Sequence, residues 1–311
     1  MASRVEGEFL GQPALLIRTP LATAAVSLHG GQLLSFAPRG FDDLLWLSPD
    51  SKRAPDAIRG GVPVCWPYFG RQGQADDVPQ HGFARNTKWT LVEAGNEADG
   101  GTMIELSLPE RAGTPLRLRQ TLRIGRGLTQ ALTTHNTGPA PVAFTQALHT
   151  YLRVGDAQRV QVGGLDGLAY ADKYEGREHR QAGAWNLHDP RDPGRSDRIY
   201  HRTGGRYALH DPVLRRRIDL ATLGSRSLVV WNPGEQGIAA IGDAPAGGWR
   251  DFVCLEAANA GEDVIELAPG ATHTLQQMLG ATHLPPKVTS FGAPPKGTSF
   301  GASPKGTSFG A

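Results

Sequence analysis

Short apolar runs separated by turn signals recur along most of this chain, and long helical periodicity is almost absent. Glycine and proline, at 40 and 23 of the 311 residues, supply most of the breaks between the runs. We expect strands over residues 14–19, 24–29, 32–38, 102–108, 116–124, 128–135, 142–151, 158–162, 215–220, 227–231, 252–256 and 272–279. So many short strands predict an all-β protein, a large antiparallel β-sandwich in one domain over residues 1–283.

Two segments depart from this pattern. Residues 172–197 are polar apart from a cluster around Trp185, and we expect a long loop over one end of the sheet. Residues 284–311 repeat T-S-F-G-A with a period of nine and consist mainly of Gly, Pro, Ser and Lys. Such a composition cannot bury a core, so we expect a disordered tail of unknown role.

The overall composition excludes several classes of protein. The formal net charge is +2, from 32 basic and 30 acidic residues, which does not favour a nucleic-acid partner. The densest basic cluster, L-R-R-R at 214–217, is interpreted as a solvated strand or turn. No run approaches the ~18 apolar residues of a membrane span, and the N-terminus lacks a secretory apolar region. We therefore expect a soluble, cytoplasmic protein without a membrane partner, and a monomer.

The cysteines give no metal or redox motif. Cys65 and Cys254 both lie in apolar runs, which predicts two buried, reduced thiols and suits a reducing cytosol. Ten histidines are present, but no two lie at ligand spacing with a carboxylate, so no metal site is expected.

The stretch F-T-Q-A-L-H-T-Y-L-R-V-G-D at 144–156 mixes polar with apolar residues in loose alternation. On a strand, Thr145, Ala147, His149 and Tyr151 would share one face. An imidazole beside a tyrosine on such a face suits a proton donor, and it equally suits a hydrogen-bonded structural histidine.

Three further stretches place polar residues where a core would have none. In A-I-R-G-G-V-P at 57–63, the glycines would let the backbone approach a ligand and Arg59 would bind an oxyanion, unless Arg59 is a surface residue at a turn. In P-Q-H-G-F-A-R-N at 79–86, Gln80, His81 and Arg85 crowd one loop, which is either a binding loop or a structural one. Glu256 ends the apolar run F-V-C-L, either partly desolvated as a base or exposed at the surface.

Six motifs in order along about residues 10–280 resemble one known family. They read R-G-G-V-P-V-C-W-P-Y-F-G, P-Q-H-G-F-A-R-N, A-L-H-T-Y-L-R-V-G-D, S-D-R-I-Y, V-V-W-N-P-G and F-V-C-L-E. This series resembles the hexose-6-phosphate mutarotases (glucose-6-phosphate 1-epimerases) of the aldose 1-epimerase superfamily. The resemblance implies the β-sandwich of the galactose mutarotase type (a supersandwich). It also implies an isomerase of hexose 6-phosphates that needs no cofactor.

The resemblance also implies a role for each matching residue. It makes His149 the general acid at the ring oxygen and Glu256 the base at the C1 hydroxyl. The phosphate would be bound by Arg59 and Arg85, and the rest of the sugar by Gln80, His81 and Asp197. Leu152 and Ala257 depart from the aromatic residue and the proline that are common in the family, which puts the sugar preference in question. Two alternatives are a mutarotase of unphosphorylated aldoses and a non-catalytic β-sandwich that binds sugar phosphates.

Overall fold

The computed structural model describes residues 2–74, 76, 78–191 and 193–285. Nearly all of its regular structure is β, and every pairing between its named strands is antiparallel. The predicted fold class is therefore confirmed. Within the described residues, no helix has the length and apolar character that a membrane span requires.

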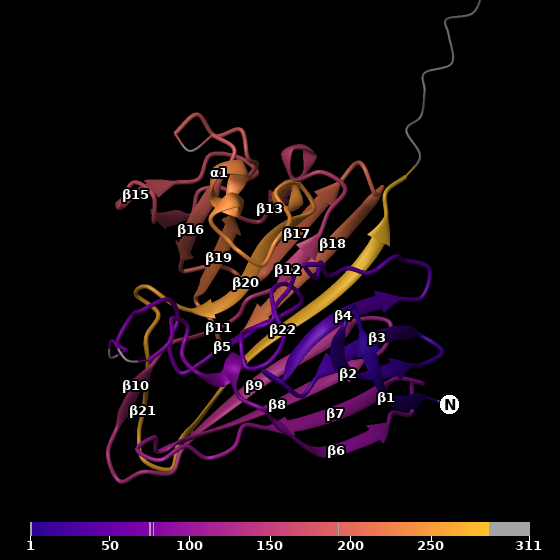
Figure 1. Cartoon of the computed structure of the whole chain (residues 1–311). Coiled ribbons are helices and arrows are strands. Elements are labelled where there is room, and N and C mark those ends of the chain that lie inside the picture. The colour runs from indigo at the N-terminus through magenta and orange to yellow at the C-terminus, as the bar shows by residue number, and fades with distance from the viewer. Residues whose placement is uncertain (1, 75, 77, 192, 286–311) are drawn as a thin grey trace, which may run out of the picture.

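Two sheets of eight strands form most of the molecule (Figure 1). The long sheet has the order β13 (Gln161–Gly163), β17 (Arg206–Asp211), β18 (Arg216–Leu223), β22 (Thr272–His283), β9 (Leu128–Asn136), β8 (Leu116–Ile124), β7 (Thr102–Ser107) and β6 (Thr90–Asn96). The site sheet has the order β15 (Arg177–Arg180), β14 (Ala169–Asp172), β16 (Ser196–His201), β19 (Ser227–Asn232), β20 (Phe252–Asn259), β11 (Gln146–Leu148) and β5 (Val64–Cys65), with β12 (Tyr151–Arg153) also paired to β20.

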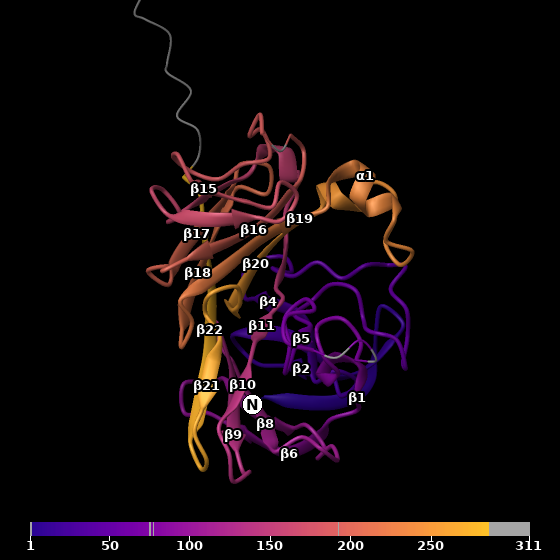
Figure 2. The ribbon, with the colours of Figure 1, turned by 90° about the vertical axis from the view of Figure 1, so that its left-hand side faces the viewer.

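Smaller elements complete the fold. The N-terminal sheet has the order β1 (Ser3–Phe9), β2 (Gln12–Arg18), β3 (Ala22–Ser27) and β4 (Gln32–Pro38), and β10 (Val142–Phe144) pairs with β21 (Ile265–Leu267). The helices are α1 (Gly234–Ala239) and the 3-10 turns η1 (Ala84–Asn86), η2 (Ala157–Arg159) and η3 (Gly248–Arg250). In Figure 2, α1 projects from the side of the molecule beyond the end of β19.

One continuous core joins the three larger sheets. Along β8 and β9, every second residue is buried, as expected for strands with one face on a core. Val26 of the N-terminal sheet, Leu122 of the long sheet and Leu255 of the site sheet belong to the same apolar cluster and are fully buried. The hydrophobic effect of this shared core holds the sandwich together.

A chain of buried amides crosses the core beneath the site sheet. The Thr150 hydroxyl donates to Gln277 Oε1 (2.7 Å), and Gln277 Nε2 donates to Gln130 Oε1 (2.9 Å). Gln130 Nε2 then donates to Gln120 Oε1 (2.7 Å), whose amide donates to the carbonyl oxygen of Gly31. We name these residues the glutamine chain. A buried amide without hydrogen-bond partners would destabilise the fold, so each amide of the glutamine chain depends on its neighbours.

Several strand predictions need correction. Residues 142–151 are divided among β10, β11 and the start of β12, because β10 pairs with β21 while β11 and β12 pair with β20 on either side of a turn at His149. In the region 158–162, residues 158 and 159 belong to the 3-10 turn η2, and the strand β13 begins only at Gln161. The expected loop at 172–197 contains β15 and the start of β16, which are rich in charged residues and therefore lack an apolar signal. The strands β1, β5, β6, β14, β17 and β21 were also missed.

The cluster at 214–217 is only partly solvated. Arg216 is 2% exposed and donates to the carbonyl oxygens of Asp42, Asp43 and Arg153. The prediction of a solvated Arg216 was wrong, because these carbonyls replace water around the guanidinium. The prediction of buried, unpaired Cys65 and Cys254 is confirmed. β22 ends at His283, and residues 286–311 of the expected tail lie outside the described residues.

Candidate active site

His149 and Glu256 lie side by side on the site sheet. β11 and β12 both pair with β20, and His149 lies in the short gap between them, opposite the part of β20 that carries Glu256. The Thr150 N–H donates to the Leu148 carbonyl (2.9 Å), so a three-residue turn is centred on His149. This turn brings His149 Nε2 to 3.5 Å from Glu256 Oε1.

Burial decides the protonation of this pair. The side chains of His149 and Glu256 are 11% and 1% exposed. Burial lowers the pKa of His149 to about 3, with Arg85 and Arg59 as further causes. It raises the pKa of Glu256 well above its usual range, and nearby Asp197 raises it further. Both pKa shifts favour the uncharged form of the group, with the transferable proton of the pair on the carboxyl group.

Each residue of the pair also has one buried polar atom that makes no hydrogen bond within the described part of the chain. Among the described residues, neither His149 Nδ1 nor Glu256 Oε2 has a hydrogen-bond partner, although both atoms are buried. Arg85 Nε is in the same condition. These three buried atoms are available to bond to a polar ligand.

The loop that carries His81 is fixed by close backbone packing. Gly82 has φ +73°, and a Cβ there would lie 2.2 Å from the Trp66 carbonyl oxygen, so only glycine fits. The Gly70 N–H donates to His81 Nδ1 (3.1 Å), which leaves the ring proton of a neutral His81 on Nε2. Burial and neighbouring cations lower the pKa of His81 well below its usual range. Its ring lies edge-on to that of His149, with 5.9 Å between centroids.

Arg85 and Gln80 lie on the same loop and differ in their contacts. Arg85 belongs to η1, and its Nη2 donates to the backbone carbonyl of Gln80 (2.8 Å). The Gln80 side chain itself is on an exposed residue. The structure thus brings Arg85 toward His149 and Glu256, because its charge acts on both, whereas Gln80 lies at the surface.

Arg59 reaches the site through Tyr151. Its Nε donates to Asp243 Oδ1 (3.0 Å), and its Nη1 donates to the Tyr151 hydroxyl (3.2 Å). The Tyr151 ring stacks on His149 with 4.9 Å between centroids. Sequence reasoning missed Asp243, which lies 184 residues from Arg59 in the loop after α1 and has no motif around it.

The glycines after Arg59 serve the fold. A Cβ on Gly60 would lie 2.4 Å from the Trp46 carbonyl oxygen, and one on Gly61 would lie 2.3 Å from that of Leu33. We expected this pair to let the backbone approach a ligand. The close approach is instead to the protein's own backbone, which fixes the direction in which Arg59 leaves the chain.

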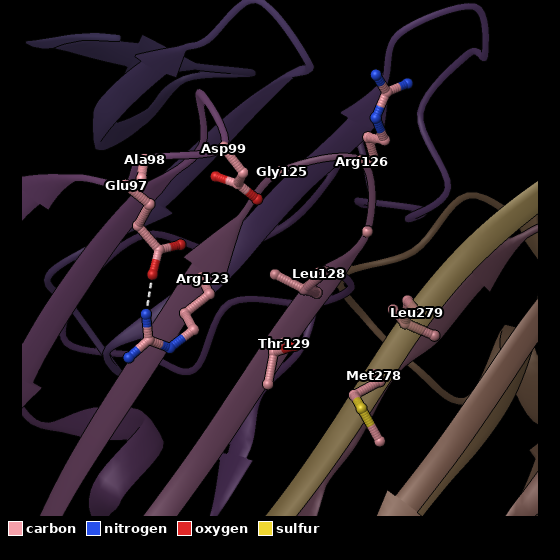
Figure 3. A pocket seen from close by; sticks show the side chains of 11 residues that line it. Glu97, Ala98, Asp99, Arg123, Gly125, Arg126, Leu128, Thr129, Met278 and Leu279 are labelled. Carbon is pink, nitrogen blue, oxygen red and sulfur yellow. Dashed lines mark ion pairs between the residues drawn. The ribbon is translucent and has the colours of Figure 1, made fainter.

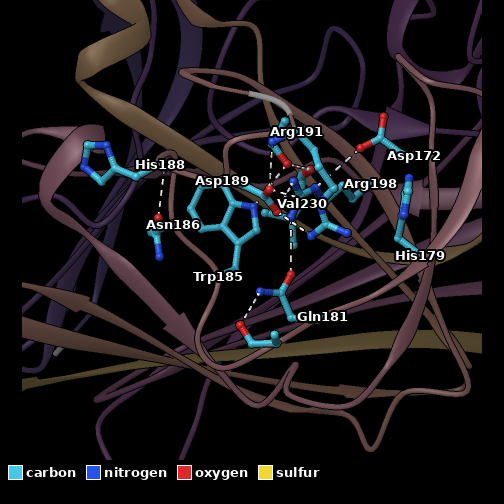
Figure 4. Close-up of polar contacts among 12 residues, drawn as sticks. Asp172, His179, Gln181, Trp185, Asn186, His188, Asp189, Arg191, Arg198 and Val230 are labelled. Carbon is cyan, nitrogen blue, oxygen red and sulfur yellow. Dashed lines mark hydrogen bonds and ion pairs between the residues drawn. The ribbon is translucent and has the colours of Figure 1, made fainter.

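Asp197 comes from β16, where it lies opposite Trp231 of β19. Its neighbour Arg198 points the other way into a buried polar cluster (Figure 4), donating to Asp189 Oδ2 (2.9 Å) and Gln181 Oε1 (3.3 Å). The Asp172 carboxylate lies 3.7 Å from Arg198 Nε. This cluster anchors the 172–197 segment and so determines where Asp197 lies.

A depression on the outer surface of the long sheet has different chemistry (Figure 3). Glu97 and Arg123 form an ion pair there, beside Met278 and Leu279. Its charges compensate each other, and it contains neither His149 nor Glu256. Among the described residues, no group of three or more His, Cys, Asp or Glu side chains is placed to hold a metal ion.

Comparison with known proteins gives one consistent result. The model of the family "Aldose 1-epimerase" matches residues 13–279. A "Putative glucose-6-phosphate 1-epimerase" of Salmonella typhimurium is 35% identical over 249 residues, covering 78% of this chain and 81% of the relative. A protein of the same name from Escherichia coli K12 is 35% identical over 255 residues, covering 80% and 83%.

Among solved structures, the crystal structure of a "putative mutarotase" from Salmonella typhimurium superposes with a TM-score of 0.79. It is 31% identical, and the alignment covers 87% of this chain and 90% of that one. The motifs singled out in the sequence, the antiparallel supersandwich and the match along 13–279 agree with one another. The chain belongs to the aldose 1-epimerase family.

Proposed function

We propose that this protein is a hexose-6-phosphate mutarotase, which interconverts the α and β anomers of glucose 6-phosphate and related phosphosugars. The observation that carries the proposal is the 3.5 Å separation of His149 Nε2 and Glu256 Oε1. The two oxygens that exchange protons in this reaction, O1 and O5, are bonded to the same carbon. An acid and a base that lie side by side are therefore suited to serve both at once.

The reaction needs two proton transfers and a rotation. Glu256 takes the proton of the C1 hydroxyl while protonated His149 donates to O5, and the C1–O5 bond breaks as the C1 carbonyl forms. After C1 rotates, the two residues exchange roles and the ring closes on the other face. A well-placed acid or base typically contributes ~10²–10⁴-fold to the rate. Because the protons only circulate between sugar and side chains, the proposed reaction uses no cofactor.

The remaining predicted residues would bind the substrate. We assign the phosphate to Arg59 and Arg85, since guanidinium groups bind phosphate oxygens in pairs. The Nε2–H of His81 and the carboxylate of Asp197 are suited to sugar hydroxyls, and Gln80 stays a prediction at the rim. We also propose a cytoplasmic enzyme that acts as a monomer; free Cys65 and Cys254 suit a reducing compartment.

The direct test follows anomeric relaxation. Freshly dissolved α-glucose 6-phosphate is mixed with the protein, and the approach to equilibrium is followed by polarimetry or NMR. We expect acceleration, and a larger one for glucose 6-phosphate than for glucose or galactose. Acceleration of no sugar at all would contradict the proposal and indicate a non-catalytic protein that binds sugar phosphates.

One observation favours a second candidate, a mutarotase of unphosphorylated aldoses. Arg59 is already paired with Asp243 and Tyr151, as expected if its role were structural. The same relaxation assay separates the two candidates, because equal or faster relaxation of galactose would select the second one.

A further inference from the structure

The surroundings of His149 are rich in positive charge. Arg59 approaches it through Tyr151, Arg85 approaches it from η1, and the charges of both act on its ring. The charge of Lys173, after β14, acts on the neighbouring ring of His81. Protonated His149 would therefore be a buried cation surrounded by other cations, which is unfavourable.

Negative charge is scarce by comparison. The charge of Asp197 on β16 acts on the pair, and burial favours the protonated form of Glu256. Asp243 is already bound to Arg59. The charges that act directly on His149 are those of Arg85 and Arg59, and they disfavour the imidazolium from which the proposed mechanism begins.

The two arginines do not act alike. Arg85 acts on both members of the pair, since it lowers the pKa of His149 and also that of Glu256. Arg59 reaches His149 through a direct series of contacts, from guanidinium to Tyr151 hydroxyl at 3.2 Å and from Tyr151 ring to His149 ring at 4.9 Å. A change in the charge of Arg59 therefore alters the balance between the two residues, whereas a change at Arg85 affects both.

We propose that the phosphate dianion of the substrate activates the catalytic pair, because its pairing with Arg59 moves the shared proton from Glu256 to His149. The inference rests on the proposed function. In this step the O–H bond of the Glu256 carboxyl group breaks and an N–H bond forms on His149, so the pair keeps its single proton. The phosphate thus activates the catalytic pair in addition to binding the substrate to the protein.

The same proton transfer would also determine which sugars react. A neutral sugar that fills the same site would bring no negative charge to the cations around His149 and would leave the proton on Glu256, so it would turn over slowly even when bound. Tyr151 becomes a positioning residue, because it holds Arg59 and His149 in fixed relation. Binding of the sugar and activation of the catalytic pair by phosphate can then be measured separately. The test supplies the sugar ring and the phosphate group as two different molecules.

The experiment uses D-xylose, which lacks the C6 group and its phosphate, together with phosphite dianion as the missing piece. We expect phosphite to accelerate the anomerisation of α-xylose by the protein about tenfold or more, since one pKa unit changes the imidazolium fraction tenfold. Arg59→Gln should abolish this activation. Arg85→Gln should raise the phosphite concentration that is needed while retaining the activation. Arg126→Gln, on an exposed residue of the outer depression, serves as the matched control.

A second measurement does not depend on turnover. In protein with ¹⁵N-labelled histidine, phosphite added at pH 7 should convert the His149 signal from neutral imidazole to imidazolium, with assignment by comparison with His149→Asn. The inference is overturned if phosphite binds without this change, or if it fails to accelerate xylose while glucose 6-phosphate is anomerised normally. If glucose 6-phosphate is not anomerised either, the proposed function itself has failed.

Discussion

Replacing Glu256 by Gln tests the catalytic pair through two independent measurements. The amide has almost the shape of the carboxyl group that it replaces, so the buried site should stay packed. It cannot accept the proton of the C1 hydroxyl. We therefore expect the enzymatic anomerisation of glucose 6-phosphate to fall by ~10²–10⁴-fold, the usual contribution of a general base. His149→Asn should cause a comparable loss by removing the acid.

The same substitution should change how stability depends on pH. Burial raises the pKa of Glu256 in the folded protein above its value of 4.5 in the unfolded chain. As the pH rises above that value, the unfolded state loses its proton first, so the wild-type protein loses stability. The loss is at most about 1.4 kcal/mol per pH unit for as long as the folded state keeps the proton. Gln has no such titration, so Glu256→Gln should gain stability relative to wild type between pH 5 and pH 7.

His149 acts in the opposite sense over a lower range. Its pKa is 6.5 in the unfolded chain and about 3 in the folded protein, so its contribution to stability grows as the pH rises from 3 to 6.5. Comparing Glu256→Gln with wild type at each pH isolates the carboxyl contribution, because His149 is present in both. Urea unfolding at pH 5 and pH 7 gives the free energies. A variant whose stability relative to wild type does not rise from pH 5 to pH 7, or that keeps full activity, would refute the reasoning.

Three other substitutions probe other parts of the site and fold. Arg59→Ala should raise the KM for glucose 6-phosphate by about tenfold or more, since a charge-assisted hydrogen bond contributes about 1.5–3 kcal/mol. Binding of glucose should change less, and equal losses for both sugars would assign Arg59 to the scaffold. Gln277→Leu should cost roughly 1–3 kcal/mol for each buried partner left unsatisfied, whereas Gln276→Leu on the outward face of β22 should be nearly neutral. Urea unfolding measures both, and equal effects would contradict the role of the glutamine chain. Gly82→Ala should distort the binding loop, because its Cβ would lie 2.2 Å from a carbonyl oxygen; an unchanged KM would show that the loop does not position the substrate.

Most of the strands could be predicted from the sequence because apolar periodicity and turn residues are local signals. The β8–β9 hairpin is an example, since its alternation and its G-R-G turn both lie within a short stretch. β15, with the sequence R-E-H-R, gave no such signal because it is an edge strand with mostly exposed residues. The strands that were missed are held in the sheets by their neighbours rather than by their own apolar pattern.

The site was predictable only as a set of separate residues. The resemblance named His149 and Glu256, but their 3.5 Å separation depends on the turn between β11 and β12, which sequence alternation does not reveal. The contact of Arg59 with Asp243 joins distant parts of the chain and has no local signature. Nor does composition show that burial places the shared proton on Glu256, because that depends on tertiary packing.

The glutamine chain has an electrical consequence. All of its hydrogen bonds run in one direction, from the Thr150 hydroxyl to the Gly31 carbonyl. Its three side-chain amides are thus aligned head to tail, with their carbonyl ends toward Thr150, and their dipoles add as the peptide dipoles of a helix do. The negative pole of this array lies under the residue that follows His149 in the chain. The core of the sandwich is therefore polarised in the sense that favours a positive charge on His149 during turnover.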